Sequence, residues 1–234
     1  MGTEGFGPRV VFELGNGIAI TETVTVTWFI MFVLVAFSIL ATRNLQKVPK
    51  GMQIITEGIV DGINGLTKQT MGEDKVGFAP YVGTLLLFIM LANIAGLFGI
   101  RPPTADANTT IGLAMMTFFM IHGFGVISKG VLGYFKGFLE PMWFLLPLNI
   151  IGELATPISL GFRLFGNIVG GMIIMGLLYG ALGGLTTFLF GINVPFMQVG
   201  IPAFLHIYFD LFAGLLQSFI FTMLTMVFVS IAMD

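Results

Sequence analysis

Apolar residues occur along this chain in long runs separated by short polar stretches, and five runs are long enough to cross a membrane. A hydrocarbon core about 30 Å thick requires about 20 apolar residues in a helix. The runs that satisfy this length lie at residues 23–42, 76–100, 109–128, 141–185 and 202–232, after an expected external segment, 1–22. The pattern predicts a single all-α membrane domain over residues 1–234, with five transmembrane helices.

The fourth run is longer than one perpendicular crossing needs. As a helix, residues 141–185 would extend about 65 Å at about 1.5 Å per residue. Such a helix must tilt, kink or lie partly in the interface, and Pro147 and Pro157 supply places to bend. We therefore expect the last two helices to be long and tilted, with the fourth ending near a break at Gly183-Gly184.

The segment 47–75 has a different pattern. Apolar residues recur there at steps of three and four, at Met52, Ile55, Ile59, Ile63 and Leu66. Polar residues fall on the opposite side, at Gln53, Glu57, Asp61, Asn64 and Lys68. This periodicity predicts an amphipathic helix that lies on the membrane surface.

The composition agrees with a membrane protein and excludes several other classes. The residues are 56% hydrophobic and 9% charged, whereas an average soluble domain is about 25% charged. A net charge of −2 does not fit a basic nucleic-acid binder. Because the chain has no Cys and no phosphate-binding GxxxxGK[ST] loop, we expect no cofactor, no resident metal and no nucleotide site.

The positive charges predict the orientation. Of the ten Lys and Arg residues, most lie between the first two spans or after the third: Arg43, Lys47, Lys50, Lys68, Lys75, Lys129 and Lys136. The opposite side has Arg9 and Arg101. Since Lys and Arg concentrate in cytoplasmic loops, the N-terminus should be outside and the C-terminus inside.

One cation, Arg163, falls within the fourth apolar run. A central Arg costs about 2.5–3.5 kcal/mol on insertion scales, and its pKa above about 12 keeps it charged. Helical spacing places small and polar residues on the same face, at Thr156, Ser159, Gly166, Asn167 and Gly170. Arg163 either faces a sliding contact, or it snorkels or pairs structurally with an acid.

The last run carries three polar residues that a regular helix would align. His206, Asp210 and Gln217 form a stripe about 16 Å long at about 1.5 Å per residue. Such a stripe indicates an aqueous path or an ion relay. Alternatively, Asp210 neutralises Arg163, and His206 is an interfacial histidine near the helix start.

Other polar residues within the spans give weaker signals. Asn93 and His122 each stand alone in an apolar run, where a helix-packing hydrogen bond is as good an interpretation as a path residue. Glu153 and Asn149 lie one turn apart near the start of the fourth run. They either line a cytoplasmic entrance or cap a bend.

The sequence from Pro157 to Asn167, P-I-S-L-G-F-R-L-F-G-N, resembles the signature of subunit a of F-type ATP synthases. Residues 103–110 resemble the loop into that family's following membrane helix, residues 48–53 the start of its cytoplasmic surface helix, and residues 217–225 its last helix. The resemblance covers roughly residues 10–232, and its five spans fit the pattern above.

The resemblance implies a stator that faces a rotating c-ring, with two offset aqueous half-channels and Arg163 between them. The glycines 166 and 170 would pack against the ring, and Asp210, Gln217, Asn167, His206, Glu153 and Ser159 would serve the ion path. The implied partners are the c-ring, the b subunits of the peripheral stalk and lipids in a bacterial plasma membrane. The subunit would translocate H⁺ or Na⁺, without being an enzyme on its own.

Two positions depart from the family pattern. Met172 stands where many relatives have a carboxylate, and Asp210 stands where many have a histidine. The family exchanges acid and base between these places, so Asp210 could take the channel acid role alone. The alternative, an autonomous secondary transporter with an Arg163/Asp210 relay, should show an internal repeat, and the amphipathic segment 47–75 has no later counterpart.

Overall fold

A computed structural model of the whole chain describes residues 9–14, 18–139, 142–191, 198 and 200–234. Five helical segments of this described part are long and apolar enough to cross a membrane, which confirms the predicted all-α membrane class. Four of them contain α1 (Glu22–Thr42), α3 (Ala79–Ile94), α4 (Ala107–Gly137) and α5 (Leu146–Phe190). The fifth joins α6 (Ile201–His206), a π-helical turn (Ile207–Ala213) and α7 (Gly214–Met233).

Several helix ends differ from the expected ones, and local residues explain why. The amphipathic helix α2 (Met52–Met71) begins after Gly51, whose φ of 59° is a left-handed conformation, rather than at residue 47. The third span continues to Gly137 instead of stopping at 128, although Gly130, at φ 72°, interrupts its helical geometry. The start of α2 therefore follows a glycine conformation, and the third span is kinked at another, and a hydropathy pattern records neither.

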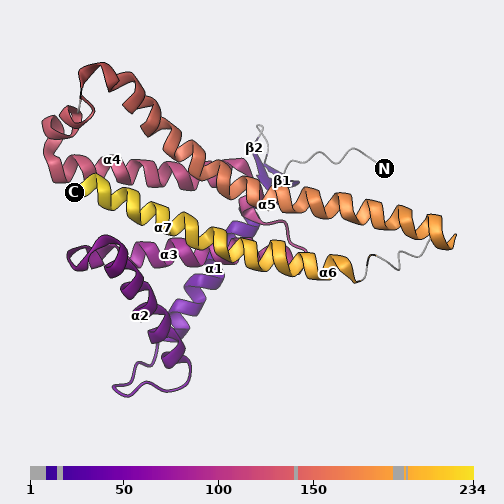
Figure 1. Cartoon of the computed structure of the whole chain (residues 1–234). Helices are drawn as coiled ribbons and strands as arrows, with labels where there is room; N and C mark the ends of the chain where they lie inside the picture. The colour runs from indigo at the N-terminus through magenta and orange to yellow at the C-terminus, as the bar shows by residue number, and fades with distance from the viewer. Residues whose placement is uncertain (1–8, 15–17, 140–141, 192–197, 199) are drawn as a thin grey trace.

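The fourth helix also differs from its expected range of 141–185. It begins at Leu146, with Pro147 in the first turn, where a missing N–H costs nothing. It does not break at Gly183-Gly184 but continues to Phe190, where Gly191 ends it at φ 61°. Pro157 lies inside the helix, and α5 changes direction part-way along its length (Figure 1).

A short β-hairpin precedes the first span, which the pattern did not predict. Strands β1 (Val10–Leu14) and β2 (Ile18–Thr21) are antiparallel. The backbone N–H of Glu22 donates to the carbonyl of Arg9 at 2.8 Å, which extends the pairing to the start of α1. The hairpin thus lies beside the first turn of α1, within the segment 1–22 that is expected to be external.

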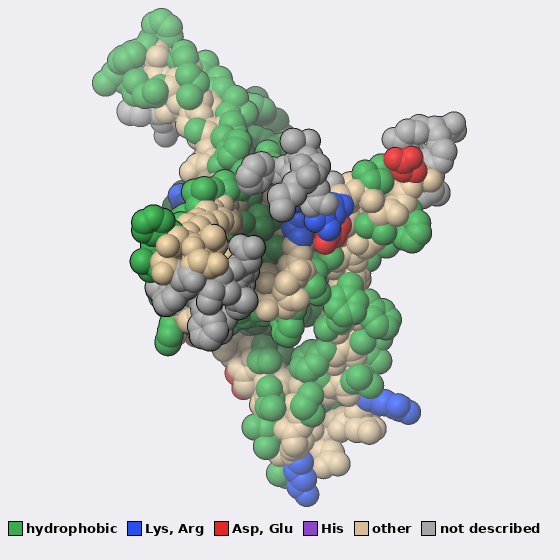
Figure 2. Space-filling model, turned by 90° about the vertical axis from the view of Figure 1, so that its right-hand side faces the viewer, with side chains coloured by type: hydrophobic (Ala, Val, Ile, Leu, Met, Phe, Trp, Pro, Cys, Tyr) green, Lys and Arg blue, Asp and Glu red, His purple; other side chains and the backbone are tan. Residues whose placement is uncertain are grey.

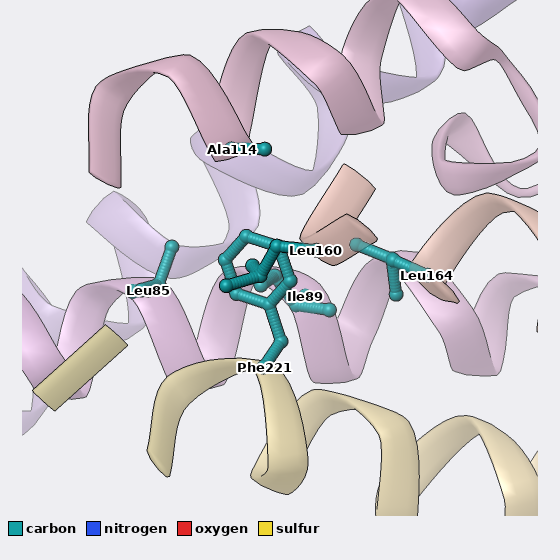
Figure 3. Packing of buried hydrophobic residues seen from close by; sticks show 6 residues of the cluster. All are labelled: Leu85, Ile89, Ala114, Leu160, Leu164 and Phe221. Carbon is teal, nitrogen blue, oxygen red and sulfur yellow. The ribbon is translucent and has the colours of Figure 1, made fainter. Parts of the chain in front are cut away.

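The helices form an elongated bundle in which α5 runs beside α6 and α7 (Figure 1). Residues from α3, α4, α5 and α7 make the central hydrophobic cluster, shown in Figure 3: Leu85, Ile89, Ala114, Leu160, Leu164 and Phe221. Leu160 and Leu164 are one turn apart on α5, so one face of this helix is buried in the bundle. Within α1, by contrast, only Thr23 and Ile30 are buried.

The C-terminal end of α2 packs against the bundle rather than standing apart from it. Met71 belongs to a second cluster with Val82, Ile121, Met226 and Val229. Nearby, Lys75 Nζ lies 2.5 Å from Asp234 Oδ1 and donates to Ser230 Oγ at 3.3 Å. These contacts connect the amphipathic helix, the start of the second span and the end of α7.

Gly161 permits close packing of α5 on α4, and we expect Gly161→Val to destabilise the bundle. A Cβ at Gly161 would lie 3.3 Å from Ile111 Cα and 3.3 Å from the Thr110 carbonyl oxygen. Overpacking of this kind costs about 1–3 kcal/mol, so the protein in detergent should unfold at a lower temperature by circular dichroism. The control Gly176→Val adds the same side chain where no described atom lies within 4 Å. Equal melting temperatures for the two variants would contradict this account of the α4–α5 contact.

Candidate functional site

Arg163 is exposed on α5, although its neighbour Leu164 is 0% exposed. The buried stripe through Leu160 and Leu164 fixes the rotation of α5, so Arg163 points away from the central cluster. Among the residues that the structure describes, no side chain makes an ion pair or hydrogen bond with Arg163. Asp210 in particular does not neutralise it, because the carboxylate of Asp210 has a different partner.

The face around Arg163 divides into an open strip and a packed side. No described atom outside the local helix backbone lies within 4 Å of a Cβ placed on Gly166 or Gly170. Ser159 is exposed as well. Asn167, however, is half-buried and donates its Nδ2–H to the carbonyl of Ala213 at 3.3 Å. The predicted polar face therefore has Asn167 turned toward the last span, while Ser159 and the two glycines stay uncovered.

Asp210 and His206 form a pair on the last span, as their spacing of four residues predicted. His206 Nδ1 lies 2.6 Å from Asp210 Oδ2, and His206 Nε2 lies 3.1 Å from the hydroxyl of Tyr179 on α5. The imidazole thus connects a carboxylate to a hydroxyl through its two nitrogens. Asp210 lies within the π-helical turn, a geometry that occurs often at functional sites.

Gln217 does not join this pair. It is 7% exposed, its Nε2 has no hydrogen-bond partner among the described residues, and it is absent from the described lining of the cavity beside Asp210. The expectation of one straight stripe assumed 3.6 residues per turn throughout. The π-helical turn between Asp210 and Gly214 changes that period, so the angular relation of Asp210 to Gln217 differs from the one expected.

A cavity of about 340 Å³, the Asp210 cavity, lies between the last span, α5 and the hairpin. Its polar lining consists of Arg9, Glu22, Asn93, Arg101, Asn167, His206 and Asp210. Met172 contributes an apolar wall. Figure 2, viewed from the right-hand side of Figure 1, shows basic side chains next to an acidic one near the middle of this end. Arg9 and Glu22 were not predicted, because nothing in the apolar pattern indicates where the hairpin folds.

A second cavity of about 630 Å³, the Glu153 cavity, lies on the other side of Arg163. Its polar lining consists of Lys129, Tyr134, Asn149, Glu153 and Thr156. The sequence pattern missed Tyr134, whose hydroxyl lies 2.5 Å from His122 Nδ1. His122 is therefore in contact with a wall residue of this cavity, which its position in the sequence did not show.

Arg163 lines a third, smaller cavity of about 200 Å³ together with Thr156 and Ser159. This cavity shares Gly152, Thr156 and Phe228 with the Glu153 cavity, so the two adjoin. Along α5, Glu153 and Met172 lie on opposite sides of Arg163, about 15 Å and about 13.5 Å away at about 1.5 Å per residue. Among the described lining residues, none is common to the Asp210 cavity and the other two.

Comparison with known proteins identifies the family of this chain. The family model for the ATP synthase A chain matches residues 24–230. The chain belongs to the ATP synthase subunit a family. It is similar to the sodium ion specific ATP synthase subunit a of Propionigenium modestum, with 40% identity over 229 residues that cover 91% of this chain and 74% of that protein. It is also similar to ATP synthase subunit a 2 of a Bradyrhizobium strain, with 38% identity over 224 residues that cover 95% and 93% of the two chains.

The resemblance inferred from the R-L-F-G-N sequence is thereby confirmed. This subunit a is a multi-pass membrane protein and a stator subunit of the F-type ATP synthase, in which it assembles with other subunits. Within it, Asn93 is a helix-packing residue, since it is 1% exposed and donates to the Gly214 carbonyl and to Ser218 Oγ, both at 2.9 Å. The contacts of Asn93 agree with the helix-packing interpretation, although the residue also borders the Asp210 cavity.

Proposed function

We propose that this subunit passes H⁺ or Na⁺ between two half-channels that are offset across Arg163. The observation that carries this proposal is an exposed guanidinium between two separate polar cavities, without a counter-ion among the described residues. The Asp210 cavity would open to the outside and the Glu153 cavity to the cytoplasm. This assignment follows from the Lys and Arg distribution, which favours an outside N-terminus and an inside C-terminus.

An uncovered Arg in the hydrocarbon region requires a partner. Leaving it exposed to lipid costs about 2.5–3.5 kcal/mol or more, whereas a carboxylate beside it offsets that cost. The open strip of Gly166 and Gly170 offers room for a closely packed helix. We therefore assign this strip to the c-ring, whose subunits each present a membrane carboxylate. The b subunits of the peripheral stalk and lipids would cover other exposed helix faces, including most of α1.

The guanidinium performs two tasks in this scheme. It attracts an arriving ring carboxylate that has lost its ion, with about 4 kcal/mol at 4 Å and an effective dielectric constant of about 20. It also repels cations that would otherwise leak from one cavity to the other. Both tasks depend on a charge that persists at every working pH, which Arg supplies and Lys or His does not.

Asp210 and His206 would load and unload the ion on the outer side. The carboxylate faces the cavity, and the imidazole at 2.6 Å from it accepts or donates a proton as Asp210 changes charge. Met172 on the same cavity wall cannot titrate, so Asp210 would take the acid role that many relatives give to that position, and Glu22 is a second carboxylate in the same lining. On the inner side, Glu153 would receive ions that pass Ser159 and Thr156 beside Arg163. The role of Gln217 in the ion path stays a prediction.

The translocated ion is H⁺ or Na⁺. The Propionigenium modestum relative is named as sodium ion specific, which favours testing Na⁺ first. The ring carboxylate and its neighbours determine much of the selectivity, and they lie outside this chain. Sodium dependence of ion uptake by the whole complex distinguishes the two ions.

We expect Arg163→Ala to abolish ATP-driven ion uptake in vesicles that contain the assembled complex. Without the fixed cation, the ring carboxylate should not release its bound ion, and passive leakage of ions between the cavities should rise. Arg43→Ala is the matched control, because Arg43 is an exposed Arg just after α1. Retained uptake in an assembled Arg163→Ala complex would show that the guanidinium is structural and would remove the basis of the proposal.

Single cysteines should report the two sides of the path. This chain has no native Cys, so Met172→Cys and Glu153→Cys each introduce a unique thiol in the subunit. A membrane-impermeant thiol reagent should label position 172 from the outside and position 153 from the inside. Leu164→Cys, at a site that is 0% exposed, should label from neither. Labelling of positions 172 and 153 from the same side would contradict the two half-channels.

Gly166→Leu should weaken attachment of the c-ring, because the added side chain fills the strip where the ring would approach. The expected result is a lower amount of ring that copurifies with the subunit, together with poorer coupling of ATP hydrolysis to ion uptake. Gly112→Leu makes the same change on α4, at an exposed position where no described atom lies within 4 Å. If both variants retain the ring and couple normally, the strip is not the docking surface.

A further inference from the structure

The C-terminal junction of the π-helical turn Ile207–Ala213 is bound by amide side chains from two other helices. Asn93 Nδ2 on α3 donates to the carbonyl of Gly214 at 2.9 Å. Asn167 Nδ2 on α5 donates to the carbonyl of Ala213 at 3.3 Å. Two successive carbonyl groups of the last span are thus fixed from two helices, at the point where π-helical geometry changes to the α-helix α7.

Of the two amides, Asn93 is the more tightly constrained. Its Oδ1 accepts from Thr104 Oγ1 at 2.7 Å, and its Nδ2 also donates to Ser218 Oγ at 2.9 Å. The side chain is 1% exposed. A Cβ on Gly214 would lie 3.1 Å from Asn93 Cβ, tighter than nine in ten real contacts, so a larger residue at 214 would displace Asn93 by a few tenths of an ångström. The amide therefore serves as a fixed point for the last span.

The direction of Asp210 depends on this junction. Asp210 lies inside the π-helical turn, and a Cβ placed on Gly96 would be 3.5 Å from its Oδ1, so the carboxylate faces the end of the second span. A π-helix bonds residue i to i+5 instead of i+4. Conversion of the turn to α-helix would shift the register by one residue, which rotates Asp210 by about 100° relative to α7. Such a rotation would carry the carboxylate away from its cavity.

We propose that Asn93 is a positioning residue for ion transfer at Asp210. Its hydrogen bond to the Gly214 carbonyl keeps the π-helical turn in place and thereby keeps Asp210 and His206 directed into the Asp210 cavity. This inference rests on the proposed function, in which Asp210 belongs to the outer ion path. The buried amide of Asn93 would thus affect transport indirectly, through the direction of Asp210.

The direct test measures the direction of position 210 without relying on transport. Asp210→Cys gives the subunit its only thiol, and a membrane-impermeant methanethiosulfonate reagent is applied to the assembled complex in vesicles. Adding Asn93→Leu should slow labelling about tenfold, because the labelling rate follows the fraction of time that the thiol faces water. Labelling at the same rate with and without Asn93→Leu overturns the inference.

Thr117→Val is the matched control. It removes the buried hydrogen bond between Thr117 and Thr225, 3.1 Å long, which also joins another helix to α7 but lies away from the turn. The control should leave the labelling rate unchanged, whereas a fall equal to that of Asn93→Leu would mean that any loss of packing has the same effect. If Asn93→Leu does not assemble, Gly214→Ala tests the same contact by adding a methyl group against Asn93.

A second measurement separates this inference from the proposed function. In the Cys-free subunit, Asn93→Leu should lower ATP-driven uptake and shift its dependence on pH or Na⁺, and Thr117→Val should shift neither. Asp210→Asn is measured beside them. Unchanged uptake with Asp210→Asn overturns the proposed ion path, whatever the labelling shows. Slowed uptake with Asp210→Asn, together with unchanged labelling in Asn93→Leu, overturns the positioning role alone.

Discussion

A charged guanidinium without a counter-ion among the described residues is the constraint around which this subunit is organised. Arg163 cannot lose its proton, and the buried stripe of Leu160 and Leu164 prevents it from turning inward. In the proposed mechanism, a carboxylate of the c-ring supplies the missing charge. The stator would then be electrostatically complete only where this partner lies against the exposed Arg163.

Several polar residues elsewhere in the bundle, unlike Arg163, have hydrogen-bond partners within the chain. Asn93, Thr104 and Ser218 bond to one another, and Thr117 bonds to Thr225, so these buried side chains have partners. The buried Nε2 of Gln217, by contrast, has no hydrogen-bond partner among the described residues. Satisfied groups of this kind rigidify a membrane bundle, because an unmet donor or acceptor in that environment is expensive. A rigid interior would allow the polar groups of the two cavities to keep defined positions while the ring moves in the proposed mechanism.

The membrane spans and the position of Arg163 could be predicted, because they depend on the lengths of the apolar runs and on the helical periodicity of the residues within them. Apolar length predicts a crossing, and a spacing of four residues predicts that His206 and Asp210 meet. Gln217 could not be placed in the same way, since the π-helical turn changes the period that the prediction assumed constant. The hairpin, with Arg9 at its edge, was missed because such short strands resemble any loop until the chain around them is folded.

The make-up of the Asp210 cavity also bears on how the subunit is synthesised. Its wall combines Arg9 and Glu22, which are synthesised before the second to fifth spans, with His206 and Asp210, which belong to the fifth span and are synthesised after the other four. A nascent chain that has inserted four spans lacks one side of this cavity. In the proposed mechanism, the outer route would be completed only when the final span enters the membrane, so a partly made subunit would not short-circuit the ion gradient on which the cell depends.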